Sequence, residues 1–254
     1  SYLNLSGNQI GAIMAKYILE AHKNAGTLPE NAALCKSIVS TDLVTKIAES
    51  YGATMFNVLT GFKFIAEKIQ EFEEKHNHTY MMGFEESFGY LIKPFVRDKD
   101  AIQAVLVVAE LAAYYRSRGL TLADGIEEIY KEYGYYAEKT ISVTLSGVDG
   151  AEQIKAIMAK FRDNGPKELN NTAITVVEDF KAQTSTATDG TVTALTTPPS
   201  DVLKYTLADG SWIAVRPSGT EPKIKFYIAV VGESNEDSQT KIANIEAEIN
   251  AFVK

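Results

Sequence analysis

Hydrophobic residues in the first half of the chain alternate between helical and extended spacing. Segments whose apolar residues recur every three or four positions are separated by short runs of apolar and β-branched residues. The pattern predicts helices at 7–22, 42–51, 62–75, 100–118 and 121–134, and strands at 37–40, 54–58 and 80–82. Alternating strands and helices are typical of layered α/β domains. We therefore expect an α/β/α layered domain with a mixed sheet over residues 1–136.

The second half of the chain, residues 137–254, has a different pattern. It predicts a helix at 150–162, a final helix with Ile242, Ile245 and Ile249 as its apolar stripe, a threonine-rich loop at 183–197, and strands at 140–145, 172–177, 202–207, 211–215 and 223–231. Asp209 and Gly210 stand between two of these strands, and an Asp-Gly pair in that position is typical of a tight hairpin. We expect a smaller α+β domain with an antiparallel sheet.

Two helix starts carry capping signals. Ser6 is followed three residues later by Gln9, which is the spacing of a capping box. Asp98 or Asp100 is a natural N-cap for the apolar helix that follows. These signals indicate where two of the helices in the first domain begin.

Composition restricts the class of protein. The chain has 254 residues, 45% of them hydrophobic, which is enough to bury the cores of one large domain or two ordinary ones. No apolar run approaches the length of about 20 residues that spans a bilayer, and no signal peptide is visible. Cys35 is the only cysteine, so no internal disulfide forms. We expect a cytoplasmic protein that does not bind membranes.

The formal net charge of −8 bears on the ligands that the protein attracts. An acidic surface repels the phosphate backbone of nucleic acids over long range, so we expect no nucleic-acid partner. A small phosphorylated ligand remains compatible with this charge because it needs only a local positive pocket.

Residues 216–222, with the sequence RPSGTEP, have the composition of a phosphate-binding loop. Arg216 can bind an oxyanion through two parallel N–H bonds. Ser218 and Thr220 offer hydroxyl donors, and Gly219 lets the backbone approach an anion closely. The alternative interpretation is an ordinary polar turn with a solvated arginine.

Residues 83–90, with the sequence GFEESFGY, follow the strand predicted at 80–82. They should emerge at the carboxyl end of that strand, where open α/β sheets bind ligands. An extended backbone would direct Glu85 and Ser87 to one side, and a carboxylate beside a hydroxyl suits a sugar. Two alternatives stay open: a metal-binding or acid–base pair formed by Glu85 and Glu86, and a plain exposed loop.

Further positive charge lies close by in the sequence. Arg97 and Lys99 precede the apolar helix and are not needed for its capping, so either could face a sugar phosphate. The sequence contains neither G-x-G-x-x-G nor G-x-x-x-x-G-K-[ST], the two common glycine-rich nucleotide motifs.

Four segments together resemble the α-D-phosphohexomutase family, which comprises phosphoglucomutases and phosphomannomutases. Residues 83–89 resemble its sugar-recognition loop, and residues 216–222 resemble its phosphate-binding loop. Residues 60–64, TGFKF, look like a third family motif, and residues 6–9 are similar to a helix start in bacterial members. The order and spacing of these motifs resemble the third and fourth domains of the four-domain family fold.

The resemblance implies a role for each matched residue. Glu85 and Ser87 would bind sugar hydroxyls, and Thr60 and Gly61 would belong to a substrate loop. The non-transferring phosphate would be bound by Arg216, Ser218, Gly219 and Thr220, and Lys99 would contact phosphate. The same hydroxyl-binding residues would serve glucose and mannose phosphates alike.

The resemblance also implies what this chain does not carry. Family members use a phosphorylated serine in a Ser-His-Asn-Pro-like loop and bind Mg²⁺ with an Asp-x-Asp-x-Asp-Arg loop, and this sequence contains neither. It therefore resembles the C-terminal half of a mutase, whose partners would be the missing N-terminal domains of the same polypeptide.

The family reaction interconverts hexose 1-phosphate and hexose 6-phosphate through a phosphoserine enzyme and a hexose 1,6-bisphosphate intermediate. By resemblance, this chain would bind the hexose phosphate without carrying out the chemistry, so we expect it to be inactive alone. The Mg²⁺ ligands would lie outside it. The alternative is a standalone, non-catalytic module that binds sugar phosphates.

Overall fold

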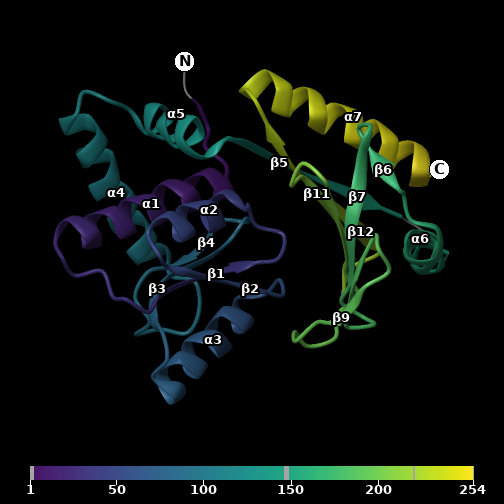
Figure 1. Ribbon diagram of the computed structural model, residues 1–254, viewed down its shortest axis with the longest axis horizontal. Coiled ribbons are helices and arrows are strands. Elements are labelled where there is room, and N and C mark those ends of the chain that lie inside the picture. The colour runs from purple at the N-terminus through teal and green to yellow at the C-terminus, as the bar shows by residue number, and fades with distance from the viewer. Residues whose placement is uncertain (1–2, 146–148, 220, 254) are drawn as a thin grey trace. The chain divides into compact units, whose positions relative to one another are not determined.

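The computed structural model describes residues 3–145, 149–219 and 221–253. The chain divides into two compact units between Gly134 and Tyr135. Figure 1 shows helices packed on a small sheet in the first unit and a larger sheet in the second. Each unit is described by itself below.

The sheet of the first unit has four strands in the order β2-β1-β3-β4. Central strand β1 (Ala32–Ser37) pairs in parallel with β2 (Thr54–Val58) and with β3 (Thr79–Glu85). The edge strand β4 (Gly89–Leu91) pairs antiparallel with β3. The sheet is therefore mixed, and the carboxyl ends of β1, β2 and β3 lie at the same edge.

Helices cover both faces of this sheet. They are α1 (Gly7–Asn24), α2 (Leu43–Ser50), α3 (Phe62–Lys75), α4 (Ala101–Ser117) and α5 (Leu122–Tyr133). The α3 face is an apolar core that contains Ala33 and Cys35 of β1. On the other face, Phe84 packs so tightly against α1 that a Cβ at Gly11 would lie 2.6 Å from its ring. Figure 1 shows α1 and α2 on one side of the strands and α3 on the other.

The sheet of the second unit is antiparallel throughout. Its strand order is β5-β12-β11-β10-β7-β8-β9, and β6 pairs with β7 outside this path. The strands are β5 (Tyr135–Thr144), β6 (Glu168–Leu169), β7 (Thr172–Asp179), β8 (Thr184–Ala187), β9 (Val192–Ala194), β10 (Leu203–Leu207), β11 (Trp212–Pro217) and β12 (Lys223–Gly232). The predicted fold class, an α/β/α domain with a mixed sheet followed by an α+β domain with an antiparallel sheet, is confirmed.

One face of the larger sheet supplies the core of the second unit. Helices α6 (Gly150–Asn164) and α7 (Asn235–Val253) contribute apolar residues to the same cluster as alternate residues of the strands. Val215 of β11 and Phe226 of β12 belong to this core. Because successive residues of a strand point to opposite faces, Arg216 and Lys225 lie on the other face. Strand alternation thus places two cations side by side.

Three predictions of local structure are wrong. The strand expected at 37–40 lies instead at Ala32–Ser37, and the β-branched pair Ile38-Val39 belongs to the connection to α2. The strand expected at 80–82 is longer and extends to Glu85. The chain then turns and forms β4, which pairs antiparallel with it, although the polar residues of this segment predict a loop. The loop expected at 183–197 contains β8 and β9, because threonine suits an exposed hairpin as well as a loop.

Other local predictions are confirmed. Ser6 and Gln9 form the capping box at the start of α1, and Asp100 caps α4 by accepting from the backbone N–H groups of Ile102 and Gln103. Strands β10 and β11 form a hairpin through Asp209 and Gly210, whose φ of 85° suits glycine.

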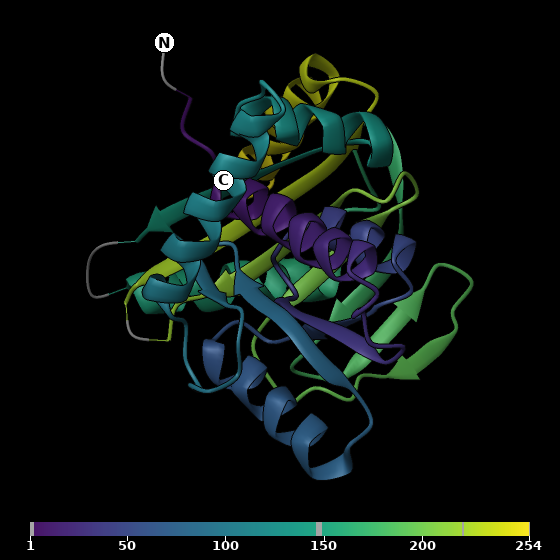
Figure 2. The same ribbon diagram turned by 90° about the vertical axis from the view of Figure 1, so that its left-hand side faces the viewer.

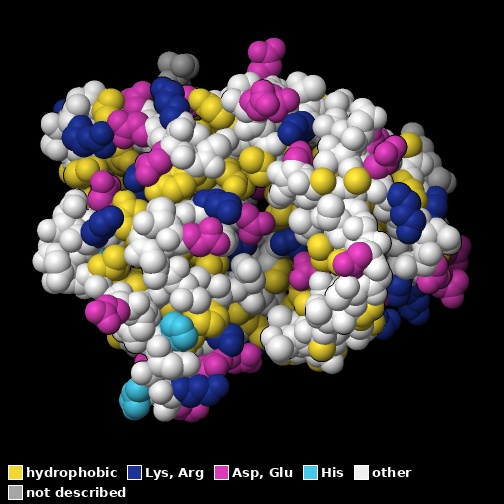
Figure 3. Space-filling view, in the orientation of Figure 1, with side chains coloured by type: hydrophobic (Ala, Val, Ile, Leu, Met, Phe, Trp, Pro, Cys, Tyr) yellow, Lys and Arg dark blue, Asp and Glu magenta, His cyan; other side chains and the backbone are white. Residues whose placement is uncertain are grey.

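Two surface properties complete the description. On the face drawn in Figure 3, acidic and basic side chains are interspersed with hydrophobic ones. Among the residues that the structure describes, no helix combines the length and the apolar character that crossing a bilayer requires.

Candidate functional site

Glu85 lies at the carboxyl edge of the first sheet and is the last residue of β3. Its side chain is buried although it carries a carboxylate, with only 6% of the residue exposed. The backbone N–H of Gly61 donates to Glu85 Oε1 over 2.6 Å. Gly61 precedes the first residue of α3, where the helix dipole stabilises negative charge. The end of β3 and the start of α3 thus hold one carboxylate between them.

Gly61 needs to be glycine at this position. Its φ of 126° and ψ of 121° lie in a region that residues with a Cβ rarely adopt. This conformation directs its N–H at Glu85. The structure therefore brings together Glu85 and Gly61, which the sequence had placed in separate motifs. The hydroxyl of Thr60 is buried and has no hydrogen-bond partner within residues 3–145, 149–219 and 221–253.

Lys99 lies beside Glu85, on the far side of Gly89. A Cβ built on Gly89 would lie 3.2 Å from Lys99 Cδ and 3.6 Å from both Glu85 Oε2 and Phe62 Cδ2. Lys99 Nζ is 5.7 Å from the centroid of the Phe62 ring, and 55% of the Lys99 side chain is exposed. The side chains of Glu85, Lys99 and Phe62 therefore lie around a residue that has no side chain, and Lys99 Nζ also lies 3.6 Å from Asp98 Oδ1.

Ser87 lies in a different environment from Glu85. Residues 86–88 form the turn between β3 and β4, and Phe88 has a φ of 64°. Ser87 is exposed, whereas Glu85 is buried. The expectation that an extended backbone directs both side chains to one side is therefore wrong, because the chain reverses direction directly after Glu85.

Glu86 faces the connection between β1 and α2. Its Oε2 accepts from Ser37 Oγ at 3.1 Å and from Ser40 Oγ at 3.4 Å, while its backbone N–H donates to Ser40 Oγ at 3.1 Å. Glu85 and Glu86 thus bind different groups, which argues against the paired acid–base alternative. Among the described residues, no group of three or more His, Cys, Asp or Glu side chains is arranged to hold a metal ion.

A buried lysine contacts the same connection between β1 and α2. Lys36 is fully buried, and its Nζ lies 3.1 Å from the carbonyl oxygen of Ser40 and 2.8 Å from Asp42 Oδ1. A buried ammonium group needs such partners to offset the cost of desolvation. Sequence reasoning missed Lys36, Ser37 and Ser40. The available signal was one lysine inside an otherwise apolar and small-residue strand.

The start of α1 packs against the tip of the β3–β4 hairpin. A Cβ at Gly7 would lie 2.0 Å from the carbonyl oxygen of Glu86, so only glycine fits there. The hydroxyl of Tyr90 donates to the carbonyl oxygen of Gly7 at 2.8 Å, and burial raises the pKa of Tyr90. These contacts hold the hairpin that carries Glu85, in addition to those that Glu86 makes with Ser37 and Ser40.

In the second unit, the predicted phosphate loop connects β11 to β12. The Ser218 N–H donates to the carbonyl oxygen of Lys223 at 2.7 Å, and Ser218 Oγ accepts from the Glu221 N–H at 3.2 Å. Gly219 is exposed, and a Cβ there would meet nothing within 4 Å. Thr220, which the sequence also assigned to this loop, lies outside the described residues.

Arg216 lies directly opposite Lys225 in the β11–β12 pair. Within the described part of the chain, its guanidinium group makes no hydrogen bond or ion pair. Like charges opposite each other destabilise a sheet, and an anion bound over them removes that repulsion. Sequence reasoning missed Lys225, which the alternation of polar and apolar residues along β12 could have identified.

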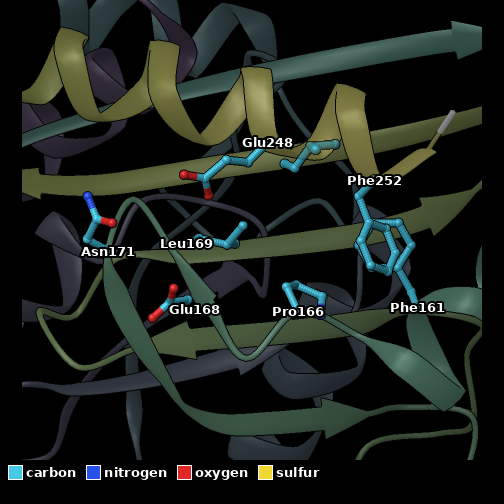
Figure 4. Close-up of a pocket in the computed structure, with 8 residues that line it drawn as sticks. Phe161, Pro166, Glu168, Leu169, Asn171, Glu248 and Phe252 are labelled. Atoms are coloured by element: carbon cyan, nitrogen blue, oxygen red, sulfur yellow. The ribbon is translucent and has the colours of Figure 1, made fainter.

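A separate cavity of the second unit contains none of the predicted site residues. Figure 4 shows it between α7, the end of α6 and the β6–β7 turn, lined by Phe161, Phe252, Leu169 and Glu248. Both carboxylate oxygens of Glu248 accept from the backbone N–H of Asn170, so this acid ties α7 to the β6–β7 turn. We assign this cavity a packing role.

The contacts of Glu86 generate a stability prediction. We expect Glu86→Ala to lower the free energy of unfolding of the chain by roughly 1–3 kcal/mol, because it removes the acceptor shared by two buried serine hydroxyls. Urea unfolding followed by circular dichroism measures the change. Glu74→Ala, on the exposed side of α3, is the matched control and should stay within about 0.5 kcal/mol. Equal stabilities for the two variants would contradict this role.

Two protein-family models match the chain, one for each of its two units. Residues 6–133 match the family model described as phosphoglucomutase/phosphomannomutase, alpha/beta/alpha domain III. Residues 148–250 match the model described as phosphoglucomutase/phosphomannomutase, C-terminal domain.

Curated relatives have the same family name. The chain is 37% identical over 243 residues to a phosphoglucomutase of Staphylococcus aureus (strain bovine RF122 / ET3-1), covering 95% of this chain and 42% of the relative. It is 37% identical over 239 residues to a phosphoglucomutase of Staphylococcus haemolyticus (strain JCSC1435), covering 94% of this chain and 42% of that protein. The chain thus spans about two fifths of the length of these relatives.

Solved structures share the fold. The open form of pp63/parafusin, a phosphoglucomutase from Paramecium, matches with a TM-score of 0.63 at 18% identity, over 98% of this chain and 41% of that one. A phosphomannomutase homologue from Thermus thermophilus matches with a TM-score of 0.60 at 16% identity, over 96% of this chain and 41% of that one. With both units matched by the family models, the chain belongs to the phosphoglucomutase/phosphomannomutase family.

Proposed function

We propose that this chain is the C-terminal portion of a phosphohexomutase that interconverts hexose 1-phosphate and hexose 6-phosphate. The family models cover an alpha/beta/alpha domain III and a C-terminal domain, and the curated relatives named phosphoglucomutase are more than twice as long as the match. The relatives at 37% identity support the substrate class, and the contacts of this chain's own residues support their roles.

The observation that carries the proposal is the environment of Glu85. A buried carboxylate with one oxygen bound to the Gly61 N–H is oriented before any ligand arrives. A carboxylate accepts several hydrogen bonds, so it can bind adjacent hydroxyls of a sugar ring. Ser87, exposed at the tip of the hairpin, would add a hydroxyl from the turn. Lys99 would bring positive charge to a phosphate near the ring.

The loop of the second unit would bind the phosphate that is not transferred. Arg216 would bind it with two parallel N–H bonds, and Lys225 would supply a second positive charge from the neighbouring strand. Ser218, Gly219 and Thr220 would complete the loop, where the open space around Gly219 lets a phosphate oxygen approach the backbone.

This division of labour suits a mutase. In the proposed reaction, a phosphoserine donates its phosphoryl group to the sugar, the resulting hexose 1,6-bisphosphate reorients, and the serine accepts the other phosphoryl group. The substrate must be bound in two opposed orientations. A fixed phosphate anchor and a set of hydroxyl acceptors permit this, because either phosphate can occupy the anchor while Glu85 accepts from different hydroxyls.

Mg²⁺ and the reactive serine belong to the longer protein in this proposal. The described residues do not offer a set of carboxylates that fits a divalent cation, so no step is derived through the metal here. The contribution of this chain is to bind and orient the hexose phosphate.

We expect the chain of residues 1–254 to show no turnover of glucose 1-phosphate, even with Mg²⁺ and glucose 1,6-bisphosphate. The full-length protein should convert it under the same conditions, as a coupled assay for glucose 6-phosphate would show. Turnover by the pure chain would overturn the proposal. An inactive full-length protein whose C-terminal portion still binds glucose 1-phosphate would instead favour the standalone binding module.

We expect Arg216→Lys to weaken binding of glucose 1-phosphate by roughly 10-fold, because the charge stays while one of two charged hydrogen bonds is lost. Calorimetric titration of the chain measures the affinity. Arg116→Lys, an exposed position on α4, is the matched control for the same chemical change and should bind like the wild type. Equal affinities for all three proteins would contradict the assignment, and a loss of thermal stability without a loss of affinity would make Arg216 a structural residue.

A further inference from the structure

Helix α4 is apolar around its whole circumference but is packed on one side only. Its sequence, AIQAVLVVAELAAYYRS, contains just three residues with charged or amide side chains, Gln103, Glu110 and Arg116. Only Leu111 and Tyr115 are fully buried. A helix that is hydrophobic all round is normally enclosed by other elements. More apolar side chains of α4 are therefore exposed than its sequence leads us to expect.

The exposed side of α4 forms a continuous stripe. We define the α4 outer stripe by five of the exposed apolar residues of α4, which are Ile102, Val105, Leu106, Ala109 and Ala113; Ala101 and Ala112 are exposed as well. Their spacing of three and four residues places them along one face of the helix. Ile102 is 84% exposed, and Val105 and Leu106 are each 68% exposed. Figure 2 shows α4 turned towards the viewer, with no other element of the first unit in front of it.

Two of the three charged or amide side chains of α4 contact other parts of the first unit, and the third, Arg116, is exposed beyond Ala113 at the end of the stripe. Gln103 accepts from the backbone N–H groups of Ile92 and Lys93, and Glu110 accepts from the hydroxyl of Tyr17. Both therefore serve contacts inside the first unit. The loop that leads into α4 adds another large apolar side chain, since Phe95 is 74% exposed.

We infer that the α4 outer stripe is the surface on which a preceding domain of the full-length polypeptide packs. The inference rests on the proposed function in one respect, that this chain is the C-terminal portion of a longer protein. The curated relatives have more than half of their length outside the match, and the matched part is named domain III and the C-terminal domain. The occupant would thus be an apolar surface of a domain that precedes residue 1.

The size of the stripe favours an occupant in the same polypeptide. A stable complex between separate chains buries about 800 Å² on each partner, which three large apolar side chains do not supply. A covalently linked domain is present at high effective concentration, so a smaller apolar contact suffices. A membrane-surface helix would carry Lys and Arg beside its apolar face. Helix α4 contains no lysine and a single arginine, near its C-terminal end.

The accessibility of an introduced thiol tests this inference without relying on activity. Cys35, the only cysteine of this chain, is fully buried, and burial raises the pKa of its thiol to about 12, so it stays protonated and unreactive. Val105→Cys places a reporter on the α4 outer stripe. Val192→Cys, at a 59% exposed position on β9, is the matched control. Labelling by a maleimide is followed by peptide mass spectrometry in the chain and in the full-length protein.

We expect the thiol introduced by Val105→Cys to react at least 10-fold more slowly in the full-length protein than in the chain of residues 1–254. The thiol introduced by Val192→Cys should react at similar rates in both. Equal rates at the Val105 position, or equal slowing at both positions, would overturn the inference. Protection of the chain alone that grows with its concentration would overturn it in favour of a second copy, and protection only by added lipid vesicles would do so in favour of a membrane.

The outcome separates this inference from the proposed function. Protection at the Val105 position in a full-length protein that lacks mutase activity would support the interface and contradict the proposed function. Full mutase activity with an unprotected thiol would support the proposed function and contradict the interface.

Discussion

The hydrogen bond between the Gly61 N–H and the buried carboxylate of Glu85 joins the end of β3 to the start of α3, the two elements on which the candidate site of the first unit depends. Lys99 lies close by, because a Cβ at Gly89 would be 3.2 Å from Lys99 Cδ and 3.6 Å from Glu85 Oε2. Burying a carboxylate is costly unless hydrogen bonds compensate. Here a backbone donor and a helix N-terminus supply that compensation, so the charge is available at a defined position.

Contacts on the β3–β4 hairpin hold the Glu85 carboxylate in this position. Glu86 accepts from Ser37 and Ser40, and the contact at Gly7 leaves no room for a Cβ beside the hairpin. Lys36, enclosed and paired with Asp42, fixes the connection to which Glu86 is bound. A ligand group held by such contacts loses little conformational freedom on binding, which is the physical basis of preorganisation. Lys99 differs from this hairpin, because 55% of its side chain is exposed and its Nζ lies 3.6 Å from the exposed carboxylate of Asp98.

The sequence predicted the fold class and most helices, because these depend on periodicity and on short-range composition. It did not predict that Ser87 lies in an exposed turn directly after the buried Glu85, since a turn after a polar strand end looks the same in sequence as an extended loop. The structural role of Lys36 was not predicted, because it arises from contacts with Ser40 and Asp42 that form only in the folded chain. The position of Lys225 opposite Arg216 follows from the pairing register of β11 and β12, which the sequence alone does not give.

The proposed role of the Glu85 carboxylate as a sugar ligand is central to this function, and Glu85→Gln in the full-length protein tests it. Glutamine keeps an oxygen that can accept from the Gly61 N–H, so thermal unfolding should be nearly unchanged, while the charged acceptor for the sugar is lost. With charged hydrogen bonds contributing about 1.5–3 kcal/mol, kcat/KM for glucose 1-phosphate should fall roughly 10- to 100-fold. Glu74→Gln, the matched exposed control, should behave like the wild type. An unchanged kcat/KM for Glu85→Gln would contradict the account.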